Sequence, residues 1–196
     1  MWQEVIILKK QFIELLLHEN VNRLGMDRLI EYLQNETDFF VAPASVRNHG
    51  TESGGLLFHS LAVHKNIFKL SNIYGFDSQI YHDSLTIISL LHDVCKANFY
   101  KEVLKWRKNE NNRWEQYPSW DVDDQLPLGH GEKSARIVSK FINLTDDEYA
   151  AIRWHMGAWG TEDYSGRQSL NAAMEKYPLV LLLQMADLAA TYYDKK

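Results

Sequence analysis

The 196-residue chain lacks several features that would each place it in a particular class of protein. It has one cysteine, Cys95, so no disulfide can form within the chain, and this cysteine usage favours a reducing compartment. No apolar run approaches the roughly 20 residues that cross a bilayer. The apolar stretch VIILKKQFIELLL is interrupted by Lys9, Lys10 and Glu14 and is not typical of a signal peptide. We expect a cytoplasmic protein with no membrane partner.

The chain also lacks an excess of positive charge, because its formal net charge is -5. A protein that coats a duplex or an anionic membrane is usually basic. We therefore expect no strong nonspecific binding of nucleic acid, and we expect any phosphate to bind in a pocket. With 45% hydrophobic and 24% charged residues, the composition is that of one globular domain.

The spacing of apolar residues along most of the sequence is that of helices. Apolar residues recur at helical spacing in most of the chain, and the capping-box sequence TDDE at Thr145 opens one further helix. The predicted helices cover residues 4–19, 26–36, 56–74, 78–93, 130–142 and 178–193. Residues 38–55, which are rich in small residues, are predicted to form a loop.

One stretch has a different pattern. In VLKWRKNENNRWEQY, apolar and charged residues alternate on both sides of the turn sequence NENN, which indicates a β-hairpin. The following PSWDVDDQLPLG is predicted to be an acidic loop. We expect a single all-α domain over residues 1–196, with N-terminal helices at 1–36, a core at about 54–194 and a hairpin insertion at about 101–128.

Six polar residues lie in or beside apolar helical stretches, where an unpaired buried side chain costs a few kcal/mol. They are His59, His92, Asp93, His130, His155 and Asp187. Each one alone fits a helix cap, a satisfied core histidine or an ion pair. Together they form the nitrogen and oxygen ligand set of Mn, Fe, Co, Ni or Zn, and they predict a site for one or two divalent ions. Cys95 is interpreted as a small packed residue.

These residues lie in five ordered segments: GGLLFHSLAV, LLHDVCK, GHGEKS, RWHMG and MADLAAT. In order and spacing they resemble the HD-domain metal-dependent phosphohydrolase superfamily, which has an all-α fold. The loop sequence DFFVAPASVRNHG resembles that of small stand-alone HD hydrolases. GHGEKS and HMGAWG are similar to parts of the HD domain of 3′–5′ exoribonucleases.

The resemblance implies specific roles for the predicted ligands. The first metal site would contain His59, His92, Asp93 and Asp187, and the second would contain His130 and His155, with Asp93 bridging. Two such ions clamp a phosphoryl oxygen and activate water. Lys96 would stabilise negative charge on the phosphate, although a cation at a helix C-terminus is an equally good interpretation.

Other charged residues near these segments are candidate substrate contacts. Arg47 and His49 precede the first ligand, and they either contact phosphate or remain solvated in the loop. Glu132 and Lys133 follow His130 and either support the site or belong to an exposed helix face.

The resemblance implies hydrolysis of a phosphomonoester or phosphodiester, in a nucleotide or at an oligonucleotide end. A metal- or nucleotide-binding signalling module without catalysis is the alternative. A third interpretation, nucleic-acid binding, is disfavoured by the acidic charge. A di-iron oxygenase is possible in principle on the same scaffold.

Overall fold

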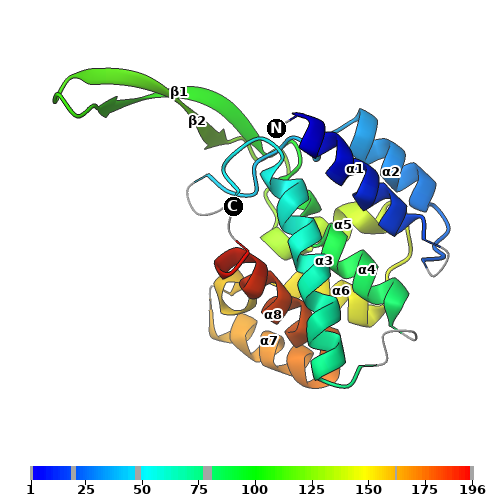
Figure 1. The fold of residues 1–196 in the computed structure, drawn as a ribbon. Helices are drawn as coiled ribbons and strands as arrows, with labels where there is room; N and C mark the ends of the chain where they lie inside the picture. The colour runs from blue at the N-terminus through cyan, green and yellow to red at the C-terminus, as the bar shows by residue number, and fades with distance from the viewer. Residues whose placement is uncertain (1, 19–20, 47–49, 77–80, 162, 195–196) are drawn as a thin grey trace.

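The computed structural model describes residues 2–18, 21–46, 50–76, 81–161 and 163–194, and this part of the chain forms a helical bundle with one projecting hairpin (Figure 1). The first four helices are α1 (Trp2–Leu16), α2 (Met26–Asn35), α3 (Gly55–Ile73) and α4 (His82–Leu91). The last four are α5 (His130–Ser139), α6 (Asp146–Trp154), α7 (Tyr164–Lys176) and α8 (Pro178–Tyr192). Two short 3₁₀ helices follow α4 and α6, namely η1 (Val94–Lys96) and η2 (Gly157–Gly160). The all-α fold class is confirmed.

Helix α4 lies at the centre of the bundle. All seven residues from Leu85 to Leu91 are buried, so no side of the helix faces solvent over these two turns. Leu90 and Leu91 pack with α1 and α2, whereas Leu85 and Ile88 pack with α3, α6 and α8. Because each buried Leu or Ile contributes roughly 1.5–3 kcal/mol, α4 joins the two halves of the core firmly.

The helix boundaries follow from local chemistry. Thr145 forms the predicted capping box, since its Oγ1 accepts from the Glu148 amide at 3.2 Å and Glu148 accepts from the Thr145 amide at 2.8 Å. Pro178 begins α8, where a proline costs no backbone hydrogen bond. Helix α7 was not predicted, because only Leu170 and Ala173 of its 13 residues are buried in the core. Its first turn is capped by Asp163.

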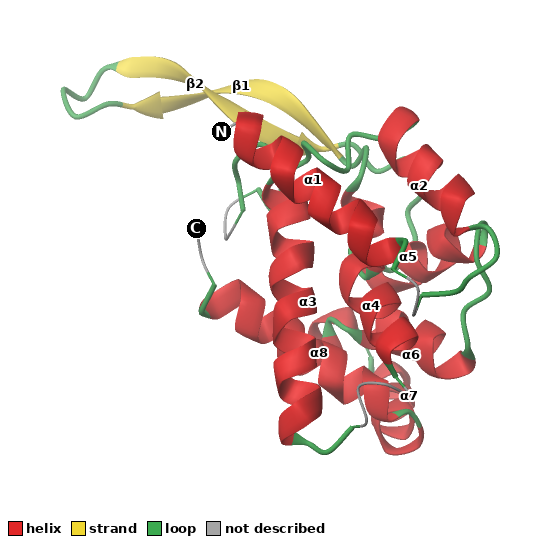
Figure 2. Cartoon of the chain, turned by 45° about the vertical axis from the view of Figure 1, so that its right-hand side comes forward, coloured by secondary structure: helices red, strands yellow, loops and turns green. Residues whose placement is uncertain are grey.

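Strands β1 (Tyr100–Lys108) and β2 (Trp114–Val122) pair antiparallel in the register Tyr100↔Val122 to Lys108↔Trp114. The predicted hairpin is confirmed, but the prediction of a loop from residue 118 was wrong for residues 118–122, which belong to β2. Both strands of a two-stranded hairpin are edge strands, where Pro118 can turn its nitrogen away from the partner. The hairpin extends well beyond the helices (Figure 2).

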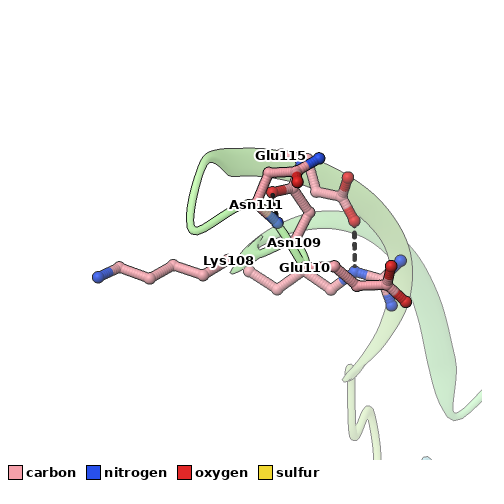
Figure 3. A pocket seen from close by; sticks show the side chains of 6 residues that line it. Lys108, Asn109, Glu110, Asn111 and Glu115 are labelled. Atoms are coloured by element: carbon pink, nitrogen blue, oxygen red, sulfur yellow. Dashed lines mark hydrogen bonds and ion pairs between the residues drawn. The ribbon is translucent and has the colours of Figure 1, made fainter.

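The tip of the hairpin borders an open hollow of about 450 Å³ (Figure 3). Its lining residues are Arg107, Lys108, Asn109, Glu110, Asn111 and Glu115. Arg107 donates to Glu115 at 2.8 Å across it. None of the predicted ligands lies in this hollow, so it is separate from the candidate site.

Among the helices that the structure describes, none is long and apolar enough to cross a membrane.

Candidate metal centre

The six predicted ligands come from five parts of the bundle and lie together beside α4. His59 belongs to α3, His130 begins α5, His155 follows α6, and Asp187 belongs to α8. His92 and Asp93 lie between α4 and η1. His92 still has helical dihedrals, but Asp93 has φ -109° and ψ 16°, so the helix ends between the two residues. This break lets neighbouring side chains turn toward one point.

One side of the centre is formed by His59, His92 and Asp187. The Nε2 atom of His59 lies 3.0 Å from Asp187 Oδ1 and 3.3 Å from His92 Nε2. These three side chains present one donor atom each within 4.8 Å of one another, which we call the first donor group. The spacing is close enough for a single ion to contact all three.

Asp93 links this group to the remaining histidines through both of its carboxylate oxygens. Its Oδ2 lies 3.4 Å from His92 Nε2 and 3.6 Å from His59 Nε2. Its Oδ1 lies 2.8 Å from His130 Nε2 and 3.5 Å from His155 Nε2. Both oxygens of Asp93 thus face imidazoles, and the role of Asp93 as a bridging ligand stays a prediction.

The tautomers of two histidines are fixed by backbone carbonyls. The Nδ1 atom of His92 donates to Ser89 O at 2.9 Å, and that of His155 donates to Ile152 O at 2.7 Å. Carbonyls only accept, so Nδ1 carries the hydrogen in both rings, and in a neutral ring the lone pair is on Nε2, which faces the centre.

The Nε2 atom of His155 is buried and has no hydrogen-bond partner among the described residues. It nevertheless points at the anionic Asp93, at 3.5 Å. A lone pair that faces a carboxylate in a buried position is favourable when a cation lies between them. The donors therefore fit a divalent metal ion.

The charge of the centre is balanced in part by Lys96, whose Nζ donates to Asp93 Oδ2 at 2.6 Å. Burial alone would raise the pKa of Asp93, but the Lys96 ammonium beside it and the hydrogen bond from His130 hold it well below its usual value. Burial alone would lower the pKa of Lys96, but Asp93 raises it above its usual value. Burial would also raise the pKa of Asp187, and the hydrogen bond from His59 lowers it instead. Both acids are therefore charged.

Two of the other predicted substrate contacts, Lys133 and Glu132, have partners of their own. Lys133 donates to Asp124 at 2.5 Å and lies over the Phe99 ring. Glu132 accepts from Tyr149 at 2.7 Å and pairs with Arg153 at 2.9 Å. Arg47 and His49 lie outside the described residues. These four roles stay predictions.

Two residues near the centre were not identified from the sequence. Cys95 Sγ lies 3.3 Å from His130 Nδ1 and 3.6 Å from its Nε2. Tyr100 begins β1 close to Lys96. Burial and the nearby Asp93 raise the pKa of Tyr100 above its usual value, although Lys96 offsets part of this rise. A lone cysteine and an aromatic residue at a strand start carry no pattern of their own that indicates a site.

The donor atoms of the described residues fall into three overlapping groups. Besides the first group, these are His92 with Asp93 and His155 (the second donor group) and Asp93 with Cys95 and His130 (the third donor group). Imidazole and carboxylate ligands suit Mn, Fe, Co, Ni and Zn.

Comparison with known proteins gives the class to which this fold and site belong. The model of the HD domain matches residues 56–191, which is more than half of the chain. The chain therefore belongs to the HD-domain family, whose members are in general metal-dependent phosphohydrolases. No curated protein matches the chain, and no solved structure does either. The predicted membership of the HD superfamily is confirmed, whereas the similarity to exoribonucleases stays a prediction.

Proposed function

We propose that the protein hydrolyses a phosphate ester, either in a nucleotide or at the end of an oligonucleotide, with divalent ions held by its histidine and aspartate cluster. The observation that carries this proposal is the position of Asp93. Each of its two oxygens lies near a different imidazole, so Asp93 can serve two adjacent ions. Two adjacent ions are an arrangement that phosphoryl-transfer enzymes use to stabilise charge around phosphorus.

The accessible side of the centre supports a small or terminal phosphate as the substrate. His92, Asp93 and His155 are at most 2% exposed, so they close the centre toward the core. The side chains of Lys96, Asp187 and His130 are 12%, 14% and 28% exposed. A phosphate must approach across these three residues. A terminal phosphate reaches so small an exposed area more easily than a phosphate in the middle of a duplex does.

The roles of the chain's own residues follow from their contacts. His59, His92, Asp93, His130, His155 and Asp187 would hold the ions. A bound divalent ion supplies Lewis acidity toward phosphoryl oxygen and a lowered pKa for water. The carbonyls of Ser89 and Ile152 hold the rings of His92 and His155 in place before substrate arrives.

Lys96 is the candidate cation for the substrate. One of its three N–H donors contacts Asp93, so two remain to contact the phosphate or the leaving oxygen. The raised pKa of Lys96, which burial opposes and Asp93 causes, keeps it charged at neutral pH. A fixed and largely buried charge stabilises the transition state without reorganisation. Arg47 and His49 are the further residues that we predict to contact phosphate.

The proposal is tested with a substrate panel of nucleoside mono-, di- and triphosphates, cyclic nucleotides and short oligonucleotides, each with Mn²⁺. Released phosphate and nucleotide are measured by chromatography. We expect turnover of at least one class and its loss in Asp93→Ala. Asp27→Ala is the matched control, because Asp27 is exposed in the first turn of α2 and lies outside the centre.

Two results would contradict the proposal. Equal turnover by wild type and Asp93→Ala would show that the activity arises elsewhere. A nucleotide-dependent rise in thermal stability without turnover of any substrate would favour the non-catalytic binding module.

A further inference from the structure

We propose that the hairpin of β1 and β2 binds the same hairpin of a second copy of this chain, so that the protein is a dimer held together by one face of each hairpin. This inference goes beyond the proposed function and does not depend on it. Figures 1 and 2 both show the hairpin standing clear of the helices, and neither strand packs extensively against any helix that the structure describes. Its base is fixed by Trp120, which donates to Thr51 O at 3.2 Å. A two-stranded hairpin is only marginally stable in water unless a further element packs on it.

The two faces of the hairpin differ in chemistry. Residues that lie opposite each other in the register share a face, as do alternate residues along each strand. On one face, Lys105 pairs with Asp121 at 2.9 Å and Arg107 pairs with Glu115 at 2.8 Å, so most of its charges are neutralised within the hairpin. We call the other face the apolar face. Its exposed residues are Glu102, Leu104, Trp106, Lys108, Trp114, Gln116, Pro118 and Val122.

The apolar face has enough surface for a dimer contact. Its large exposed hydrophobic residues are between 56% and 64% exposed, namely Leu104, Trp106, Trp114 and Val122. At this exposure they leave roughly 500 Å² of apolar surface in water, which is at the upper end of the patches that monomers carry. A stable dimer buries roughly 800 Å² on each partner, and the polar neighbours on the same face supply the remainder.

The charges on the apolar face favour a second copy as the partner. Its two charged residues, Glu102 and Lys108, lie equally far from its centre, which falls between Leu104 and Trp106. A two-fold axis across the strands reverses the partner's strands, so each Glu102 lies opposite the partner's Lys108. Each Leu104 then packs on the partner's Trp106. A face with one acid and one base has no net charge, whereas a nucleic-acid strand is held by several cations along its phosphates.

The same symmetry keeps the two helical bundles apart. The hairpin leaves the bundle at Tyr100 and Val122 and ends at the turn of residues 109–113. Reversed strands put the turn of each hairpin near the base of the other, with the bundles at opposite ends. An axis along the strands would put both bundles at the same end and Glu102 opposite the partner's Trp120. The axis across the strands therefore combines apolar contact with paired charges.

The test measures the mass of the full chain in solution by sedimentation velocity over a wide range of micromolar concentrations. The monomer has a mass of 22.9 kDa, and we expect a species of twice this mass. Trp106→Ser should weaken dimerisation by about a hundredfold, because a tryptophan near the centre of a symmetric contact is lost twice.

Glu102→Lys and Lys108→Glu are the decisive variants. Each puts two like-charged pairs into the contact, so we expect each alone to weaken dimerisation by about tenfold or more. The double variant, and an equimolar mixture of the two single variants, have opposite charges facing each other again and should dimerise as the wild type does. A role for these residues within their own hairpin would not give recovery on mixing. Lys101→Glu is the matched control, because it makes the same charge change as Lys108→Glu on the other face.

Two results would overturn the dimer. The first is a monomer at every concentration, and the second is a dimer that Trp106→Ser and both charge variants leave intact. A monomer whose tryptophan fluorescence changes when a single-stranded oligonucleotide is added would overturn it too, and would assign the apolar face to nucleic acid. None of these measurements involves turnover, so their failure leaves the proposed function untouched.

Discussion

The Nε2 atoms of His59 and His92 face each other at 3.3 Å, although the Nδ1 atom of His92 is already committed to the carbonyl of Ser89. The Nε2 lone pair of His92 therefore points at a second ring nitrogen. Such a pair is stable when a proton or a metal ion lies between the two atoms. Asp187 adds a carboxylate oxygen 3.0 Å from His59. We predict that the first ion binds between this pair and its acid.

Binding of metal ions will stabilise the fold, because the donors converge only when α3, α4, α5, α6 and α8 are packed. An ion at 100 times its dissociation constant adds about 2.7 kcal/mol to the free energy of unfolding. This corresponds to a rise in Tm of about 5 °C or more for a chain of this size. Differential scanning fluorimetry of stripped protein with Mn²⁺ or Zn²⁺ measures it.

His92→Ala provides the matched comparison for the metal effect. It removes a residue shared by the first and second donor groups, so we expect the metal-dependent rise in Tm to disappear. An equal rise in the variant would show that the ions bind at a different place.

Replacing Lys96 by Met will reduce turnover by roughly 10²- to 10³-fold, the usual loss when one transition-state charge partner is removed. Methionine keeps the length of the side chain but leaves Asp93 without its cation. We expect kcat to fall more than KM changes, since the charge acts on the transition state. Steady-state kinetics with saturating metal measures both constants. A helix-terminal role for Lys96 instead predicts lower stability with unchanged kcat.

The fold will lose stability as the pH falls from about 6.5 toward 4, because of His64 on α3. Burial first, and the neighbouring His82 second, lower the pKa of His64 to about 4. His64 stacks on Phe68, and its Nε2 has no hydrogen-bond partner among the described residues. The unfolded chain takes up a proton near pH 6.5, and the folded chain does so only near 4.

This difference costs about 2 kcal/mol of unfolding free energy at pH 5 relative to pH 7. Urea unfolding of wild type and His64→Leu at both pH values measures it. We expect the variant to lose less stability than wild type between pH 7 and 5. An identical pH dependence would show that His64 takes up its proton equally well in both states.

Breaking the buried cluster around Glu148 will destabilise the fold more than removing the helix cap beside it. Glu148 is fully buried and pairs with Arg23 at 2.5 Å, and Arg23 also pairs with Asp83 at 2.6 Å. Loss of one partner of a buried ion pair costs about 3–5 kcal/mol, whereas loss of an N-cap costs about 1 kcal/mol. Urea unfolding should therefore give a larger loss for Glu148→Ala than for Thr145→Ala, with Asp27→Ala as the surface control.

Much of the centre could be predicted from the sequence because its ligands interrupt apolar helices. His92 and Asp93 stand directly after the fully buried α4, where a polar group needs a partner. Asp187 stands out in the same way in α8. The predicted helix over residues 78–93 continued through both residues, whereas the helix ends between them. The HD-domain match confirms the family, whereas the individual ligand roles stay predictions.

Other features depend on contacts that the sequence does not record. The partner of Cys95 is His130, 35 residues away, so the thiol looks like any small buried residue. Helix α7 buries few apolar side chains and therefore has a weak periodic signal. Strand β2 continues through Pro118 because β1 supplies the pairing, and local propensity alone indicates a loop there.

The most direct measurement is anomalous X-ray diffraction from crystals of the full chain grown with Mn²⁺ or Zn²⁺. We predict a strong anomalous peak enclosed by His59, His92, Asp93 and Asp187, and with Zn²⁺ a second peak beside His130 on the other side of Asp93. Fully occupied metal at another part of the surface, with no peak at Asp93, would contradict the account.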